Sequence, residues 1–210
     1  MGEMSMNKAI HAAVRRDLDR FLDALGRFPD GDRERAEQLA TAWQNFDEQL
    51  TRHHEGEHDT AWPALEKVGV SRDVLAQLDA EHDAMAHALA AARTAMGELR
   101  KSASHADAVA AEIAMRELQR VTVIHLEHEE AEIEPVYLAK KDSPEMKAMG
   151  REFAKVGPVQ GGTFFAWALD GAGPEESEAI THTVPKPVLT VITGLFGRTY
   201  RKSVAPVWRS

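Results

Sequence analysis

Apolar residues recur at alternating steps of three and four along the chain as far as about residue 140. The first series runs from Asn7 to Phe28, and the second from Arg33 to about Thr60. A third follows Ser71, a plausible N-cap, and a fourth spans roughly Ala106 to Ala139. This spacing is that of amphipathic helices that bury one face. Four such helices with short connections predict an all-α fold, an antiparallel up-down four-helix bundle over residues 1–141.

Histidine and glutamate occupy several of the inward slots of these helices. In the second series the apolar alternation ends at Leu50 and continues into a His and a Glu, and the fourth series does the same after Val121. The residues in such slots are His11, His53, Glu57, His82, His125 and Glu129. Burying carboxylates without a compensating charge costs several kcal/mol each. The pattern therefore predicts bound cations in the core.

The same skeleton occurs twice, at an offset of 72 residues: His53, Glu57 and Pro63, then His125, Glu129 and Pro135. A lone His stands 42 residues before the first copy and 43 residues before the second. Two half-sites of composition His, His, Glu indicate a two-metal site built by a duplicated pair of helices. Either Pro could end or kink its helix.

The chemistry of this set restricts the metal. A His and a Glu four residues apart lie about 40° apart around a helix, so they can share one ion or serve adjacent ions. Four imidazoles and two carboxylates suit iron, manganese or zinc and do not suit calcium. Six protein ligands cannot saturate two octahedral ions, so open positions for a small ligand should remain.

Other histidines and one glutamate fall beside the inward face. We expect them to be hydrogen-bond partners of the ligands, alternative ligands or surface residues: His54, His58, His87, His128 and Glu130.

Composition excludes several functional classes. The chain has no Cys, which removes disulfides, thiolate zinc sites and Cys nucleophiles. A net charge of −9 argues against nucleic-acid binding. The start lacks the apolar region of a signal peptide, and no apolar run has the length of a membrane span. We therefore expect a cytoplasmic protein.

Residues 142–210 are expected to form a C-terminal helical extension packed on or beside the bundle. Ser143 and Pro144 indicate the start of a fifth helix, which Gly157-Pro158 and Gly161-Gly162 should interrupt. A last amphipathic stretch runs from Pro187 to Tyr200. Residues 184–210 hold five Lys/Arg and no acid. The alternative is that residues 184–210 contact a protein partner or a second copy.

The segments around His11, His53-x3-Glu57, Glu81-His82 and His125-x3-Glu129-Glu130 resemble the hemerythrin-like, or HHE cation-binding, domain over residues 1 to about 140. The resemblance implies a non-haem di-iron centre, with four terminal His ligands and with Glu57 and Glu129 as bridges. Oxygen carriers of this family place the last bridge five residues after its His, which would nominate Glu130 instead. They also have a fifth His one turn after the third-helix ligand, where this chain has Ala86; His87 comes one residue late.

The resemblance also implies a range of functions. A centre with two iron ions would bind or reduce small oxidants, namely dioxygen, peroxide or nitric oxide, in oxidative or nitrosative stress handling, with peroxidase-like, catalase-like or oxidase activity open. The missing fifth His predicts an extra open position, which favours peroxide or nitric oxide chemistry over oxygen storage. One alternative is an iron or oxygen sensor acting through the extension. Another is a di-iron oxygenase or oxidase whose substrate pocket is lined by Phe164, Phe165 and Trp167.

Overall fold

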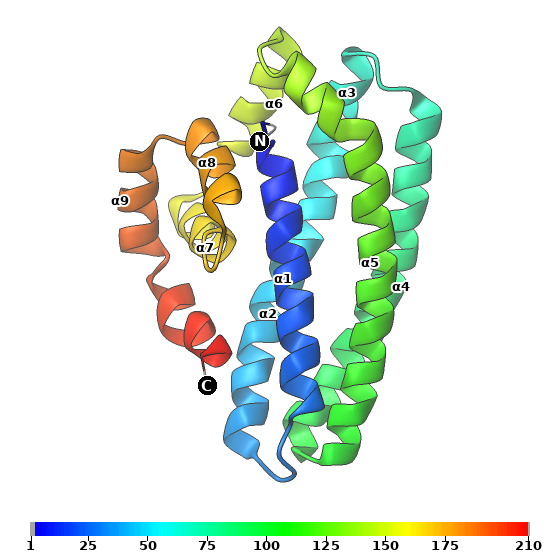
Figure 1. Cartoon of the computed structure of the whole chain (residues 1–210), viewed down its shortest axis with the longest axis vertical. Coiled ribbons are helices and arrows are strands. Elements are labelled where there is room, and N and C mark those ends of the chain that lie inside the picture. The colour runs from blue at the N-terminus through cyan, green and yellow to red at the C-terminus, as the bar shows by residue number, and fades with distance from the viewer. Residues whose placement is uncertain (1–2, 210) are drawn as a thin grey trace.

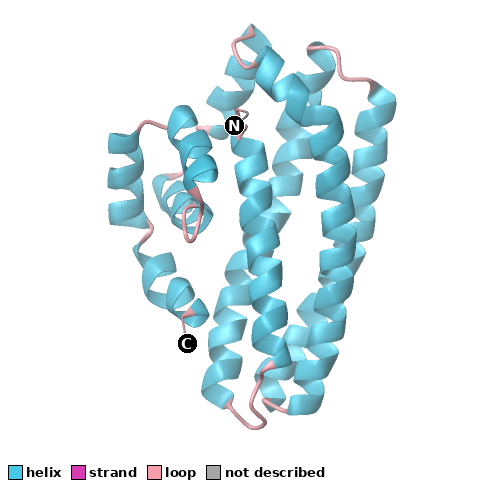
Figure 2. Cartoon of the chain, in the orientation of Figure 1, coloured by secondary structure: helices cyan, strands magenta, loops and turns pink. Residues whose placement is uncertain are grey.

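The computed structural model describes residues 3–209, and in this range the chain is almost entirely helical and contains no strand (Figure 2). Four long helices lie side by side (Figure 1): α1 (Met6–Gly26), α2 (Arg33–Gly56), α4 (Arg72–Ser102) and α5 (His105–Lys140). Helix α5 packs against α1 and α4, and α2 packs against the same two helices. The α1–α2 and α4–α5 turns both lie at the lower end of Figure 1, so successive long helices run in opposite directions. The all-α prediction is confirmed.

Side-chain caps set where these helices begin. Four residues each accept a hydrogen bond from the backbone N–H three positions later, which satisfies a donor that the helix itself leaves unpaired: Ser5, Asp32, Ser71 and Ser104. The prediction for Ser71 is confirmed. Helix α4 is followed by its C-cap Ala103, which has the left-handed φ of 53°. The carbonyl of Ala103 accepts a 2.8 Å hydrogen bond from Gly31, and this bond ties the two lower turns together.

Neither repeated proline ends its helix. After Gly56 the chain widens into a π-helical turn, η1 (Glu57–Ala61), and then continues as α3 (Trp62–Lys67). Pro63 therefore stands in the first turn of α3, directly after the π turn. Pro135 lies inside α5, which runs on to Lys140. The π turn is a feature that proteins often use at functional sites.

The apolar core of the bundle is divided into two clusters. The larger contains Leu50, Met85 and Leu126. The smaller surrounds Trp62, Leu78 and Ile133 near the upper end. Along α2 and η1, along α4 and along α5, the selected His and Glu residues stand between members of the larger cluster and members of the smaller one, whereas His11 on α1 stands beside larger-cluster residues alone. A polar layer thus interrupts an otherwise apolar interior.

The C-terminal extension packs against α1 and α2 (Figure 1). Its elements are α6 (Pro144–Phe153), α7 (Pro158–Ala168), α8 (Pro174–Thr183), α9 (Lys186–Phe196), η2 (Tyr200–Val204) and η3 (Ala205–Trp208). Helix α6 begins at Pro144 behind the Ser143 cap, as predicted. Helix α8 had no counterpart among the helices expected from the sequence.

The expectation that Gly161-Gly162 interrupts a helix was wrong, because both residues lie inside α7. The reason for a glycine at 162 is the close approach of α9. A Cβ there would lie 2.4 Å from Cβ of Phe196 and 2.7 Å from the carbonyl oxygen of Ile192. Glycine allows the two backbones to touch, so it marks a helix crossing rather than a break.

A buried polar cluster joins the extension to the bundle. The carboxylate of Asp17 on α1 accepts a 2.8 Å hydrogen bond from the indole N–H of Trp167 on α7. Arg16 and Arg20 also bond to it, and Arg20 reaches Asp170 at 3.1 Å. Trp167 is fully buried. This ring therefore fills the joint between extension and bundle and does not line an open pocket.

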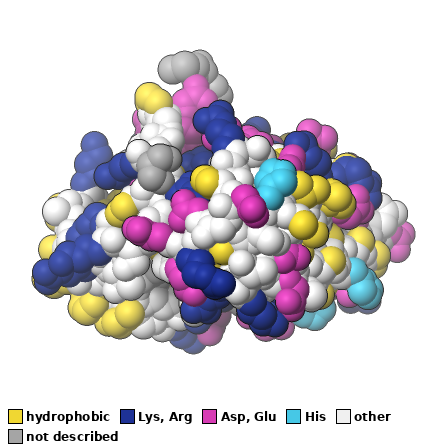
Figure 3. Space-filling view, turned by 90° about the horizontal axis from the view of Figure 1, so that it is seen from below, with side chains coloured by type: hydrophobic (Ala, Val, Ile, Leu, Met, Phe, Trp, Pro, Cys, Tyr) yellow, Lys and Arg dark blue, Asp and Glu magenta, His cyan; other side chains and the backbone are white. Residues whose placement is uncertain are grey.

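Two further observations concern membrane-spanning helices and surface charge. Over residues 3–209, no helix combines the length and the apolar character needed to cross a membrane. The face seen from below has basic and acidic side chains interspersed, so it presents no extended field of one sign (Figure 3).

Candidate metal centre

Two groups of side chains converge inside the bundle. In each group, one candidate ligand atom per residue lies within 4.8 Å of the others. The first group is His54, Glu57, His82 and His125, and the second is His11, His53, Glu57 and Glu129. All six residues selected from the sequence are included. They come from α1, α2, α4, α5 and the first residue of η1, so the centre requires every long helix of the bundle.

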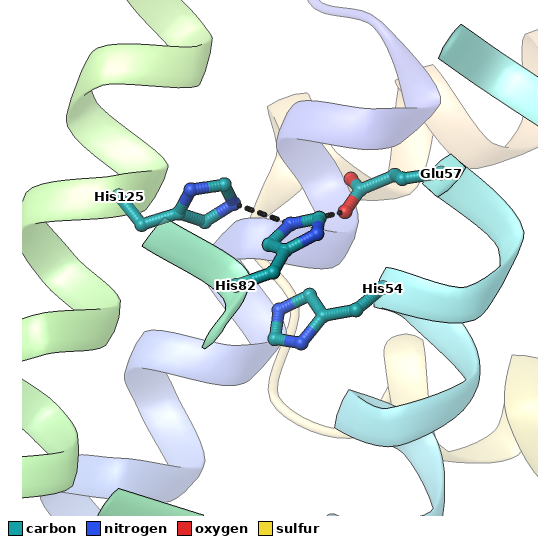
Figure 4. A group of neighbouring side chains, drawn as sticks. All are labelled: His54, Glu57, His82 and His125. Atoms are coloured by element: carbon teal, nitrogen blue, oxygen red, sulfur yellow. Dashed lines mark hydrogen bonds and ion pairs between the residues drawn. The ribbon is translucent and has the colours of Figure 1, made fainter. Parts of the chain in front are cut away.

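Glu57 belongs to both groups. One of its oxygens lies 3.1 Å from Nε2 of His53, and the other lies 3.3 Å from Nε2 of His82. Nε2 of His82 lies 3.1 Å from Nε2 of His125 (Figure 4). Two atoms that bind one ion at about 2.1 Å and at right angles are about 3 Å apart. The observed separations therefore fit two adjacent cations with the Glu57 carboxylate between them.

Unsatisfied atoms support the same assignment. Within the described residues, Nε2 of His53, Nε2 of His54 and both oxygens of Glu57 are buried without a hydrogen-bond partner. Buried polar groups are normally paired, and an unpaired one costs about 1–3 kcal/mol. These atoms all belong to the two groups, so a cation would satisfy them together.

Carboxylates outside the two groups orient two of the imidazoles. Nδ1 of His125 lies 3.0 Å from Glu81, and Nδ1 of His11 lies 3.1 Å from Glu130. A carboxylate only accepts, so each Nδ1 carries the proton and each Nε2 presents its lone pair to the centre. This arrangement of carboxylate, imidazole and metal is general among metal-binding histidines.

Glu129, and not Glu130, points into the centre. Glu129 is fully buried, and its Oε2 lies 3.2 Å from Nε2 of His11. Its Oε1 accepts a 2.9 Å hydrogen bond from the amide of Asn7, one turn before His11. Glu130 bonds instead to Nδ1 of His11 and to Arg15. The geometry thus supports Glu129, rather than Glu130, as the ligand, and no sequence pattern pointed to the role of Asn7.

The pKa values reflect seven ionisable side chains that lie close together inside the bundle. Burial lowers the pKa of His53 to about 3, with help from nearby His11, and burial together with His125 lowers that of His82 to about 4. Burial also raises the pKa of Glu57 well above its usual value, and the carboxylate of Glu129 adds to this rise. Burial opposes the ionisation of Glu129, but His11 and the other imidazoles outweigh it and hold its pKa near 2. Imidazoles without a proton are the form that binds a metal.

The neighbouring histidines divide into three cases. His54 lies in the first group, although we expected it beside the site. His128 and His58 lie nearer the surface, where Nδ1 of each bonds to an acid, Glu81 at 2.7 Å and Asp79 at 3.1 Å. His87 is exposed on α4 and joins neither group.

A sequence profile of the hemerythrin HHE cation-binding domain matches residues 5–137, which is more than half of the chain. The chain belongs to the hemerythrin HHE family. No curated protein and no solved structure matches it significantly. The region matched by the HHE domain contains every residue of the two groups, and the extension lies outside it. Membership of this family makes the chain a metal-binding protein of a type that usually holds iron.

Proposed function

We propose that this hemerythrin-like protein holds two iron ions and binds or reduces small oxidants. The observation that carries the proposal is the position of Glu57, whose two oxygens face imidazoles of different groups. A carboxylate shared in this way is what a two-ion centre needs. Bound iron would supply redox electrons and exchangeable coordination positions to dioxygen, peroxide or nitric oxide.

The residues around the centre would control protons and solvent. The groups lie between two apolar clusters, and His11, His125 and Glu129 are fully buried. Only small molecules could reach such a site without a rearrangement of the helices. Glu81 links buried His125 to partly exposed His128, so a path of hydrogen-bonding groups leads from the centre towards solvent. Proton delivery along this path would favour reduction over simple storage.

The test is a measurement of metal content combined with optical spectra. The protein is loaded with iron(II) without oxygen, and spectra are recorded before and after addition of dioxygen, peroxide or nitric oxide. We expect two iron ions per chain and new absorption bands with at least one of these oxidants. The variant Glu57→Gln removes the shared charge and should hold no more than one tightly bound ion. Glu55→Gln, an exposed change two residues away, is its control.

Two ions per chain without a response to any of the three oxidants would restrict the function to metal binding. Binding of a single ion by the natural protein would remove the proposal altogether.

A sensor is the second candidate, and one observation favours it. Helix α1 carries both His11 in the centre and Asp17 in the joint with the extension. A shift of α1 on metal binding would therefore reach residues 142–210. Limited proteolysis of the metal-free and metal-loaded protein tests this. Faster cleavage within residues 142–210 in one state supports a sensor, and equal rates argue against it.

A further inference from the structure

We infer that His54 is a fifth imidazole ligand, and that it makes the two metal positions chemically different. The inference rests on the proposed two-ion centre and adds to it. In the first group His54 stands with His82, His125 and Glu57, one candidate ligand atom of each lies within 4.8 Å of the others, and the His54 ring lies beside that of His82 (Figure 4).

Helix geometry explains how α2 can serve both positions. Successive residues are rotated by about 100° around the axis, so Glu57 lies about 40° from His53 on one side and about 60° from His54 on the other. Glu57 therefore projects between the two imidazoles. The end of α2 supplies a ligand to each position, and the first residue of η1 supplies the carboxylate that they share.

The surroundings of His54 are those of a ligand rather than of an ordinary core residue. Its Nε2 is buried without a hydrogen-bond partner in the described part of the chain. Its ring stacks on that of His82, with 4.3 Å between centroids and 25° between planes. The side chain thus places an unpaired, buried ring nitrogen within reach of the ligand atoms of His82 and His125.

Helix α4 does not provide a fifth imidazole. The expected place for one is a turn after His82, but Ala86 there is exposed to solvent. The next inward residue of α4 is Met85, which is buried. A His at position 86 would point away from the centre. The open position predicted from the missing His is therefore filled from α2, and the argument against oxygen storage that rested on this missing His loses its basis.

His54 has no equivalent in the second copy of the internal repeat. The residue 72 positions after His54 is Leu126, which is buried in the larger apolar cluster. One metal position thus has three imidazoles and a share of Glu57, and the other has two imidazoles, Glu129 and the other share of Glu57. Imidazole suits zinc, copper, iron and nickel, whereas carboxylates suit manganese and magnesium. The two positions should therefore differ in affinity and in preferred metal.

The experiment is a titration of the metal-free full-length protein with cobalt(II), followed by its visible absorption and by bound metal after gel filtration. The natural protein should take up two ions in two distinguishable steps. His54→Leu, which copies residue 126 of the repeat, should retain the tight binding of one ion and weaken the other by about 10- to 100-fold. The control His87→Leu, on the exposed side of α4, should leave both steps unchanged.

A second measurement separates a ligand from a residue that only packs. If His54 is a ligand, the metal-free His54→Leu protein should melt at the same temperature as the metal-free natural protein or higher, because an unpaired buried imidazole has been replaced by an apolar side chain. A packing role predicts a lower melting temperature without metal. Two unchanged steps in His54→Leu would overturn the inference and leave the two-ion centre intact. A single ion in the natural protein would instead remove the centre itself.

Discussion

Nδ1 of His125 lies 3.0 Å from one oxygen of Glu81. The second oxygen of the same carboxylate lies 2.7 Å from Nδ1 of His128, so both oxygens are engaged by imidazoles. Since Glu81 accepts from His125, it fixes the imidazole in the form whose Nε2 lone pair faces the centre. This acid is adjacent in sequence to His82, which belongs to the same group.

Replacing Glu81 should therefore weaken metal binding without removing a ligand. We expect Glu81→Ala to lower metal affinity by about 10- to 100-fold, the usual effect of losing a carboxylate behind a metal-binding His. Isothermal titration calorimetry with cobalt(II) measures this affinity. Glu127→Ala, an exposed acid two residues after His125, is the matched control. Equal affinities in the two variants would show that His125 needs no orienting partner.

The pair Glu129 and Glu130 gives a second prediction. Glu129 points into the centre, whereas Glu130 accepts a hydrogen bond from Nδ1 of His11 and pairs with Arg15. Glu129→Gln should lose one of the two ions, because the position with His11 and His53 would keep only one carboxylate. Glu130→Gln should retain two ions with weaker affinity. Metal analysis after gel filtration distinguishes the variants, and the reverse result would make Glu130 the ligand.

The metal-free protein should lose stability as the pH falls from about 6.5 to about 4. Folded-state pKa values of about 3 for His53 and about 4 for His82 lie below the ordinary value of 6.5, so in this window the unfolded chain binds protons that the native state does not. The stabilising contribution is complete above pH 6.5 and is lost towards the folded pKa. The pKa values of His54 and His125 are lowered too, whereas those of His11 and Glu57 are raised and act in the opposite sense.

Thermal melts of the metal-free protein at several pH values test this balance. The melting temperature should fall on acidification, and less steeply in His53→Leu, which lacks one of the lowered groups. A melting temperature that rises on acidification would mean that His11 and Glu57 dominate. The loaded protein should also release its ions over this range, because protons compete with metal for the imidazoles.

The joint between bundle and extension gives a fourth prediction. Asp17 is buried and accepts from Trp167 and two arginines. Asp17→Ala should lower the free energy of unfolding by about 3 kcal/mol, because it leaves these donors unpaired. Asp23→Ala breaks an exposed pair with Arg27 and should cost about 0–1 kcal/mol. Urea denaturation measures both changes. Similar values for the two variants would mean that the joint adds little to stability.

The sequence identified much of the centre because its ligands continue the buried apolar rows of their helices. His53 and Glu57 follow Phe46 and Leu50 at steps of three and four, and the structure brings them together as expected. His54 was placed beside the inward row, as a hydrogen-bond partner or an alternative ligand. His54 follows Leu50 by four residues and Trp43 by eleven, and both of these residues are buried. It therefore also continues a row of buried residues along α2. Which row faces the centre depends on how α2 is rotated about its axis against the helices that it packs on. The spacing of apolar residues along the chain does not reveal that rotation.

Partners from other helices were harder to predict. Asn7 and Glu130 act through contacts that join α1 to α5 across more than 110 residues of sequence. The path of the extension depends on a hydrogen bond between residues 150 positions apart, Asp17 and Trp167. Local pattern cannot show such contacts. The glycine at 162 was similarly ambiguous, because the same residue type serves at breaks and at close helix crossings.

The larger apolar cluster, which runs from the bundle into the extension, also has an evolutionary consequence. The family match ends at residue 137, but the apolar cluster around Phe21 and Trp43 continues without interruption into Trp167, Ile180 and Tyr200. The stretch that the family profile matches and the stretch that shares this apolar cluster are therefore different lengths of sequence. A relative that ended near residue 140 would need polar side chains on the faces of α1 and α2 that this chain leaves apolar. Substitutions on those two faces and the gain or loss of the tail should consequently have been acquired together.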